Sequence, residues 1–65
     1  MAGRIRYGYL DGNPVVFDDD KAFELVGGKS WGSMNVIDAM HKVRLLGKAE
    51  FDEYMPHDAP KPPIG

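Results

Sequence analysis

Apolar and polar residues alternate with a period of two near the start of the chain. In the stretch RIRYGYL, Ile5, Tyr7 and Tyr9 alternate with arginines and a glycine, which is the pattern of a strand with one buried face. Residues 15–17, VVF, form a second run of β-branched and aromatic residues. Both runs are therefore predicted to be β-strands.

The residues between the two runs predict how the strands pair. The dipeptide Asp11-Gly12 is among the preferred pairs for a two-residue type I′ turn. Such a turn makes the second strand return directly along the first, with Gly8 opposite Val15. We expect a two-stranded antiparallel hairpin, which must pack on another element because an isolated hairpin is only marginally stable in water.

After the hairpin, the apolar spacing favours helices. Residues 20–26 are predicted to form a short helix, because Asp18–Asp20 suit a helix N-terminus and apolar side chains at positions 22, 23 and 26 share one face. Gly27 then stands where a C-terminal glycine is usual.

The main helix is predicted over residues 34–46. Ser33 is a suitable N-cap and Gly47 a suitable terminator. One stripe of the helix is apolar and consists of Val36, Ala39, Met40, Val43 and Leu46.

A last short helix is predicted over residues 48–55, where Phe51, Tyr54 and Met55 share a face. A turn before it would fold these side chains beside Leu45. Pro56 ends this helix, and residues 56–65 form a proline-rich tail that we expect to be flexible.

The predicted fold is α+β, with an N-terminal two-stranded antiparallel β-hairpin packed on one main helix between two short helices. Residues 1–55 would form a single small globular domain, followed by the tail at 56–65. The predicted core consists of Ile5, Tyr7, Val16, Phe17, Phe23, Val26, Trp31, Val36, Met40, Val43, Phe51 and Tyr54.

Composition limits what this domain can do. With 65 residues and no cysteine, the chain has a small core and no disulfide framework. No apolar run approaches the ~20 residues that a membrane helix requires. The N-terminal residues lack the apolar stretch of a secretory signal, so we expect a cytoplasmic protein. The start at Met1 predicts a complete short reading frame.

Several motifs suggest a catalytic or binding site, but the residues around each motif do not complete such a site. The stretch GGKSWGS at residues 27–33 resembles part of a phosphate-binding loop, but Phe23 stands where the first glycine is required. The aspartates at 18–20 lack the spacing of a calcium loop. His41 and His57 have no cysteine or paired histidine beside them to complete a zinc site. We therefore expect no enzyme, no metal and no cofactor.

The protein is expected to bind another protein or its own copy as a non-enzymatic interaction or regulatory module. Met34, Leu45 and Met55 are predicted as surface apolar residues for such contacts, because flexible methionines suit adaptable interfaces. The edge of the strand at residues 4–9 could also accept an added strand.

The alternative function is a small nucleic-acid-binding regulator. The net charge of −2 argues against it. Signs alternate in blocks along the chain, however, and the basic block could contact phosphates. The residues concerned are Arg4, Arg6, Lys42, Arg44 and Lys48.

The tail contains Pro60-Lys61-Pro62-Pro63, which fits the P-x-x-P pattern of polyproline ligands. This pattern is also common in inert tails, which the composition favours.

Overall fold

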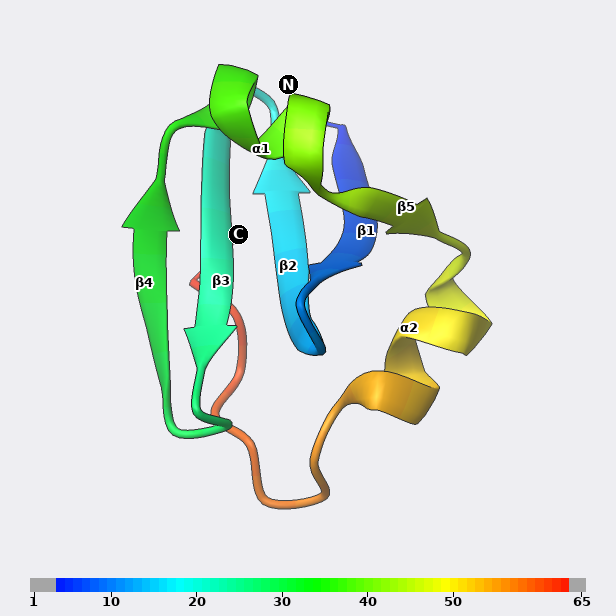
Figure 1. Cartoon of the computed structure of the whole chain (residues 1–65). Helices are drawn as coiled ribbons and strands as arrows, with labels where there is room; N and C mark the ends of the chain where they lie inside the picture. The colour runs from blue at the N-terminus through cyan, green and yellow to red at the C-terminus, as the bar shows by residue number, and fades with distance from the viewer. Residues whose placement is uncertain (1–3, 64–65) are drawn as a thin grey trace.

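The computed structural model describes residues 4–63 and shows a five-stranded antiparallel sheet with two short helices (Figure 1). The strand order across the sheet is β4-β3-β2-β1-β5. In chain order the elements are β1 (Ile5–Leu10), β2 (Asn13–Asp18), β3 (Lys21–Val26), β4 (Ser30–Met34), α1 (Val36–Lys42), β5 (Arg44–Leu46) and α2 (Lys48–Tyr54). Residues 1–3 of the predicted domain and 64–65 of the predicted tail lie outside the described residues.

The N-terminal hairpin is confirmed. β1 and β2 pair antiparallel with Gly8 opposite Val15, the predicted register. Asp11 and Gly12 have φ values of 52° and 84°, as a type I′ turn requires at both central positions.

The helix predicted at residues 20–26 is wrong, because these residues form β3. Asp19 does not cap a helix but takes a positive φ of 54° in the tight turn between β2 and β3. Its backbone N–H donates to the Arg4 carbonyl, and its Oδ1 accepts from the Arg4 N–H. A helix under two turns long is marginal, whereas a strand here is hydrogen-bonded to neighbours on both sides.

The main helix predicted at residues 34–46 is also wrong. β4 ends at Met34, α1 covers only residues 36–42, and β5 follows. The N-cap is Asn35, whose side-chain oxygen accepts from the N–H groups of Ile37 and Asp38. The helix ends at Val43, where the backbone becomes extended.

Gly8 makes the pairing of β5 with β1 possible. A Cβ atom at Gly8 would lie 2.6 Å from the Arg44 carbonyl oxygen and 2.5 Å from the Val43 side chain. The backbone of residues 43–44 can approach β1 this closely only because the position has no side chain.

The last predicted helix is confirmed within one residue as α2, although Leu45 remains 53% exposed and is not covered by it. The fold class as a whole is corrected: the protein is mostly sheet, and there is no hairpin packed on one main helix.

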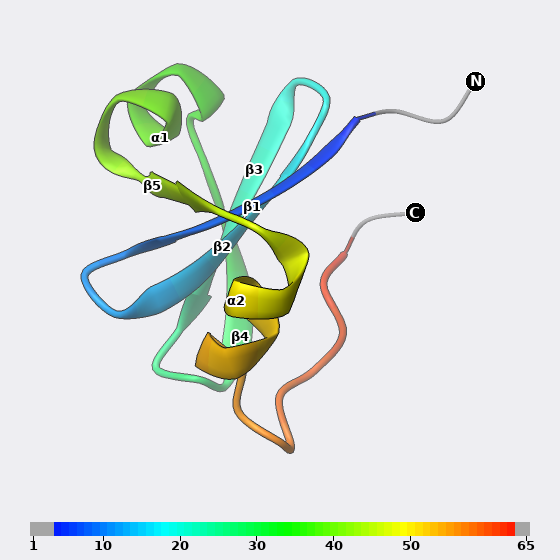
Figure 2. The same cartoon turned by 90° about the vertical axis from the view of Figure 1, so that its right-hand side faces the viewer.

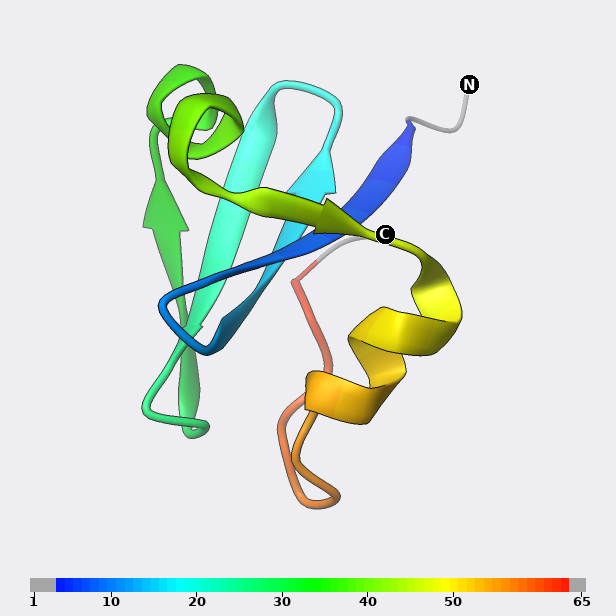
Figure 3. The same ribbon diagram turned by 45° about the vertical axis from the view of Figure 1, so that its right-hand side comes forward.

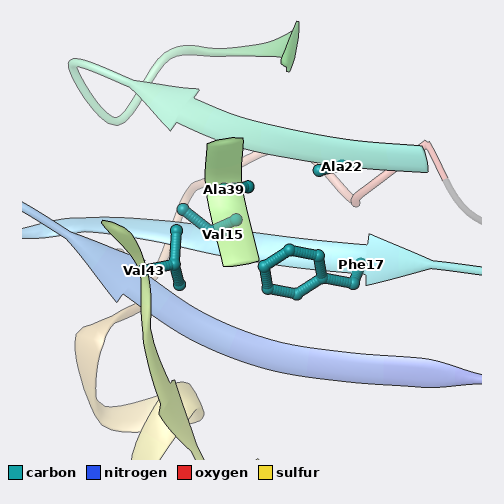
Figure 4. Packing of buried hydrophobic residues seen from close by; sticks show 5 residues of the cluster. All are labelled: Val15, Phe17, Ala22, Ala39 and Val43. Carbon is teal, nitrogen blue, oxygen red and sulfur yellow. The ribbon is translucent and has the colours of Figure 1, made fainter. Parts of the chain in front are cut away.

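One face of the sheet, here the aliphatic face, holds a cluster of aliphatic side chains and one phenylalanine. Val15 and Phe17 of β2 meet Ala22 of β3, with Ala39 of α1 and Val43 above them (Figure 4). All five are buried. Helix α1 lies over this side of the sheet, opposite residues 56–63 (Figure 2).

The predicted core is only partly correct. Val16, Phe17, Val43 and Phe51 are buried as expected. Ile5, Val26, Met40 and Tyr54 are instead exposed, and Tyr7, Phe23, Trp31 and Val36 are half-buried. The prediction missed the buried residues Pro14, Val15, Ala22, Leu25 and Ala39. At Ala22, Leu25 and Val26 the error arises because a helical period was applied to residues that alternate in a strand.

Candidate functional site

The second face of the sheet, here the aromatic face, carries large flat side chains from three strands. Val16 lies opposite Tyr7 on one side and Phe23 on the other, and residues directly opposite in a sheet project from the same face. Two residues further along each strand, Tyr9 of β1 and Leu25 of β3 share this face. Leu25 in turn lies opposite Trp31 of β4.

Helix α2 adds two more rings to this face. The Phe51 ring lies 4.7 Å from that of Tyr7 between centroids, tilted by 41°. The Tyr54 ring stacks on Tyr9 at 4.8 Å with an interplanar angle of 17°. The chain contains three tyrosines, three phenylalanines and one tryptophan, and all of them except Phe17 belong to the aromatic face.

Below these rings, the aromatic face has a small buried layer of its own. Val16 and Leu25 have no exposed surface, and Phe51 is almost fully buried. The four aromatic side chains that the strands contribute to this face, at positions 7, 9, 23 and 31, are only half-buried. Each ring thus has one part fixed in the protein and another part available for contact.

The C-terminal segment, defined here as residues 56–63, passes along this face (Figure 3). It has no helix or strand structure. The Trp31 indole Nε1–H donates to the Pro60 carbonyl oxygen at 2.9 Å. Pro56 lies beside the turn between β3 and β4, where its Cγ would be 3.5 Å from a Cβ at Gly28.

A groove of about 390 Å³ lies between this segment and α2. Its lining residues are Tyr7, Lys48, Phe51, Asp52, Met55, Lys61 and Pro62. Its walls are therefore mainly apolar, with charged groups at positions 48, 52 and 61.

Lys48 is the charged residue of the groove with defined partners. Its Nζ donates to both carboxylate oxygens of Asp52, at 2.7 and 2.9 Å, and lies 5.5 Å from the centroid of the Tyr7 ring. The hydrogen bond to Asp52 raises the pKa of Lys48 above its ordinary value of 10.5. The ammonium group is therefore charged at neutral pH, and the carboxylate of its partner balances this charge.

The three residues predicted for protein contacts are not brought together. Met34, at the end of β4, packs against the aliphatic cluster. Leu45 is exposed on β5, at the other edge of the sheet. Only Met55 belongs to the groove on the aromatic face. The predicted free edge at residues 4–9 is partly covered, because β5 pairs with Tyr7–Tyr9.

Three of the five basic residues of the nucleic-acid alternative lie beside acidic ones. Arg4 and Arg6 line a second groove, of about 400 Å³, together with Asp19 and Asp20. Lys48 is paired with Asp52. Lys42 and Arg44 are exposed at the end of α1 and the start of β5.

The motifs for which the sequence excludes a chemical role have structural roles instead. Gly27 and Gly28 take positive φ values of 62° and 72° in a turn between two strands. The residue that follows, Lys29, donates its N–H to the Val26 carbonyl. Within residues 4–63, no three His, Asp or Glu side chains gather in a way that could hold a metal ion. Neither described helix has the length and apolar character to cross a membrane.

Sequence reasoning missed the aromatic face because it assigned its residues to unrelated elements. Phe23 was predicted to lie on a helix and no strand was predicted around Trp31, although each residue lies on a strand. The alternation Phe23, Leu25 was the available signal, since period two places these side chains on one face. Comparison with protein-family models, curated proteins and solved structures finds no match for this chain.

Proposed function

We propose that this protein is a non-enzymatic module that binds another protein through its aromatic face. The observation that supports the proposal is the segregation of the rings. All but one lie on a single face, where a seven-residue helix and an irregular segment are the only cover in the described residues. Tyrosine and tryptophan are enriched in protein interfaces because their rings combine a large apolar area with few rotatable bonds.

Binding fits the described residues better than catalysis does. None of the buried residues among 4–63 is polar or charged. Active sites usually contain partly buried titratable groups whose pKa values are displaced by their surroundings. The displaced pKa of Lys48 arises from a pair of exposed side chains with Asp52, which is an ordinary surface interaction. The cytoplasm stays the proposed compartment, and the absence of cysteine is compatible with its reducing conditions.

A protein partner also fits the charges better than nucleic acid does. Proteins that bind nucleic acid present a continuous basic surface to the phosphates. Here the Arg4–Arg6 region shares its groove with two aspartates, and Lys48 is neutralised by Asp52. Bases could stack on the exposed rings without contacting charged side chains. Binding of single-stranded nucleic acid is therefore the competing outcome of the test.

The test compares two exposed apolar residues, each on a helix that lies on a different face of the sheet. Tyr54 on α2 is 42% exposed and belongs to the aromatic face, whereas Ile37 on α1 is 67% exposed and lies on the other side. The wild type, Tyr54→Ser and Ile37→Ser are immobilised, and the proteins retained from the source lysate are compared. Melting curves verify that all three are folded.

We expect Tyr54→Ser to lose partners that the wild type and Ile37→Ser both retain. Loss with Ile37→Ser alone would place the interface on α1 and contradict the proposal. Nuclease-sensitive retention, or binding of a single-stranded oligonucleotide that Tyr54→Ser abolishes, would assign the aromatic face to nucleic acid. Sedimentation of the purified protein over a concentration series tests whether the partner is a second copy of the chain.

A further inference from the structure

The geometry of the C-terminal segment points to a specific class of partner. We infer that the aromatic face binds an extended, proline-rich segment, and that residues 59–63 of the chain occupy this site as an intramolecular ligand. The inference rests on the proposed protein-binding function and gives it a ligand chemistry and a means of regulation.

The first argument is the hydrogen bond between Trp31 and Pro60. Proline has no N–H, and an extended proline-rich chain forms no internal hydrogen bonds, so its carbonyl groups remain free. An indole N–H can only donate. The Trp31 Nε1–H pairs with such a carbonyl at 2.9 Å, while its ring supplies an apolar surface beside it. Aromatic grooves that bind proline-rich peptides use this combination of a flat ring and a donor.

The second argument is the pattern of burial along the segment. Ala59 and Pro62 are half-buried, whereas Pro60, Lys61 and Pro63 are exposed. A polyproline helix has three residues per turn, so residues 59 and 62 lie on the same side of it. The half-buried side faces the protein, where Pro62 lines the groove with Tyr7, Phe51 and Met55; the exposed Lys61 also borders this groove.

The third argument is that the segment is held weakly enough to be displaced. Its described hydrogen bonds are the one from Trp31 and a local one from the Ala59 N–H to the Pro56 carbonyl. One neutral hydrogen bond contributes only about 1 kcal/mol. The groove beside the segment is also not filled by it, which leaves space for a longer or bulkier ligand.

Competition from the tethered segment can be put into numbers. A short flexible linker holds a ligand at an effective concentration in the millimolar range. For a segment whose intrinsic Kd is about one tenth of that concentration, the site is occupied about nine-tenths of the time, and a competing peptide binds roughly tenfold more weakly. Loosening the segment should therefore strengthen binding of an added peptide by up to about that factor.

The experiment uses the full chain and two matched variants, Pro62→Gly and Pro63→Gly. The two prolines are neighbours and undergo the same substitution, but only Pro62 is half-buried and lines the groove. The probe is a synthetic peptide with the sequence of residues 56–63. The control peptide has glycine in place of the residues corresponding to Ala59 and Pro62. Because the chain has a single tryptophan, its one indole N–H resonance reports directly on the site.

In the absence of peptide, we expect the indole resonance to move toward the position of a solvent-exposed indole in Pro62→Gly and to stay near the wild-type position in Pro63→Gly. In Pro62→Gly, added peptide should return the indole resonance to the wild-type position. The affinity of the peptide for Pro62→Gly should be up to about tenfold higher than for the wild type. The control peptide should not bind. Introducing Trp31→Phe into Pro62→Gly should reduce peptide affinity about fivefold, as expected for loss of one neutral hydrogen bond, followed through backbone amide shifts.

An indole resonance identical in all three proteins would show that the segment does not occupy the face in solution, and would overturn the inference. Equal peptide affinity for the wild type and Pro62→Gly, or binding to neither, would overturn it as well. If the peptide fails while lysate partners still depend on Tyr54, the inference alone is wrong. If the peptide does not bind and the lysate partners do not depend on Tyr54 either, the proposed function is wrong as well.

Discussion

Val15 and Val16 are neighbours on β2 and both are completely buried, yet their side chains enter different layers of the molecule. Val15 joins a cluster of aliphatic side chains and Phe17 beneath α1. Val16 lies between Tyr7 and Phe23, on the face that carries the half-buried rings. The cluster on the aliphatic face is buried, Phe17 included, whereas the aromatic face leaves most of its rings partly uncovered.

The covers of the two faces also differ. Helix α1 lies between β4 and β5, so both its ends are fixed by strands, and its N-terminus is capped by the Asn35 side chain. Helix α2 has no side-chain cap and leads into the C-terminal segment. A small domain has a limited apolar surface to bury. In this protein the cluster under α1 is buried, whereas most of the rings on the aromatic face keep part of their surface exposed.

The largest effect is expected from closing the space at Gly8. Gly8→Ala would force the Arg44 carbonyl and the Val43 side chain away from β1, separating β5 from the sheet and opening the aliphatic cluster. We expect a loss of about 3 kcal/mol of unfolding free energy, at the upper end for overpacking, measured by urea denaturation.

Gly32→Ala is the matched control for Gly8→Ala. A Cβ at Gly32 would meet Val26 at an ordinary contact distance of 3.6 Å. Its unfolding free energy should stay within about 0.5 kcal/mol of wild type. Equal losses of unfolding free energy in the two variants would contradict the explanation that residues 43–44 approach β1 closely at Gly8.

The pair Val15→Ala and Val16→Ala tests whether the aromatic face has a core of its own. Both side chains are fully buried, so each variant should lose about 2 kcal/mol of unfolding free energy through the cavity that it creates. A loss below about 0.5 kcal/mol for Val16→Ala alone would show that the aromatic face is loosely covered surface. The Trp31 indole resonance should shift more in Val16→Ala, which lies on the same face.

A smaller effect is expected from the cap of α1. Asn35→Ala removes the acceptor for the Ile37 and Asp38 N–H groups and should cost about 1 kcal/mol. Amide hydrogen exchange should accelerate in α1 more than in α2. Uniform acceleration in both helices would show that the two covers are not independent.

The smallest effect concerns the Lys48–Asp52 pair on α2. Because the hydrogen bond to Asp52 raises the pKa of Lys48 above 10.5, the stabilisation is fully present below that ordinary value. It disappears as the pH rises through the raised pKa. NMR titration should give Lys48 a lower pKa in Asp52→Asn than in the wild type. Identical values in both proteins would show that the pair does not form in solution.

The sequence was sufficient for elements whose signals are local. The Asp11-Gly12 turn fixed the hairpin and its register, and the spacing of Phe51 and Tyr54 located α2 to within a residue. In both cases, the residues that determine the structure lie within a few positions of one another.

The sequence was insufficient where two structures share a short apolar pattern. Residues 21–26 fit one face of a helix as well as two faces of a strand, and pairing with β2 and β4 decides between them. The contact of Gly8 with residues 43–44 that admits β5 is equally non-local. The aromatic face depends on both of these elements in register, so its rings could be identified individually but not as a group.

The strand order has a consequence for the order of assembly. β1 to β4 are joined by successive tight turns, so their pairing can begin among residues that are close along the chain. β5 must instead reach back across the sheet, since Leu46 pairs with Tyr7. Long loops close more slowly than short ones. On a ribosome, β1 can therefore gain its second neighbour only after the chain as far as Leu46 has emerged.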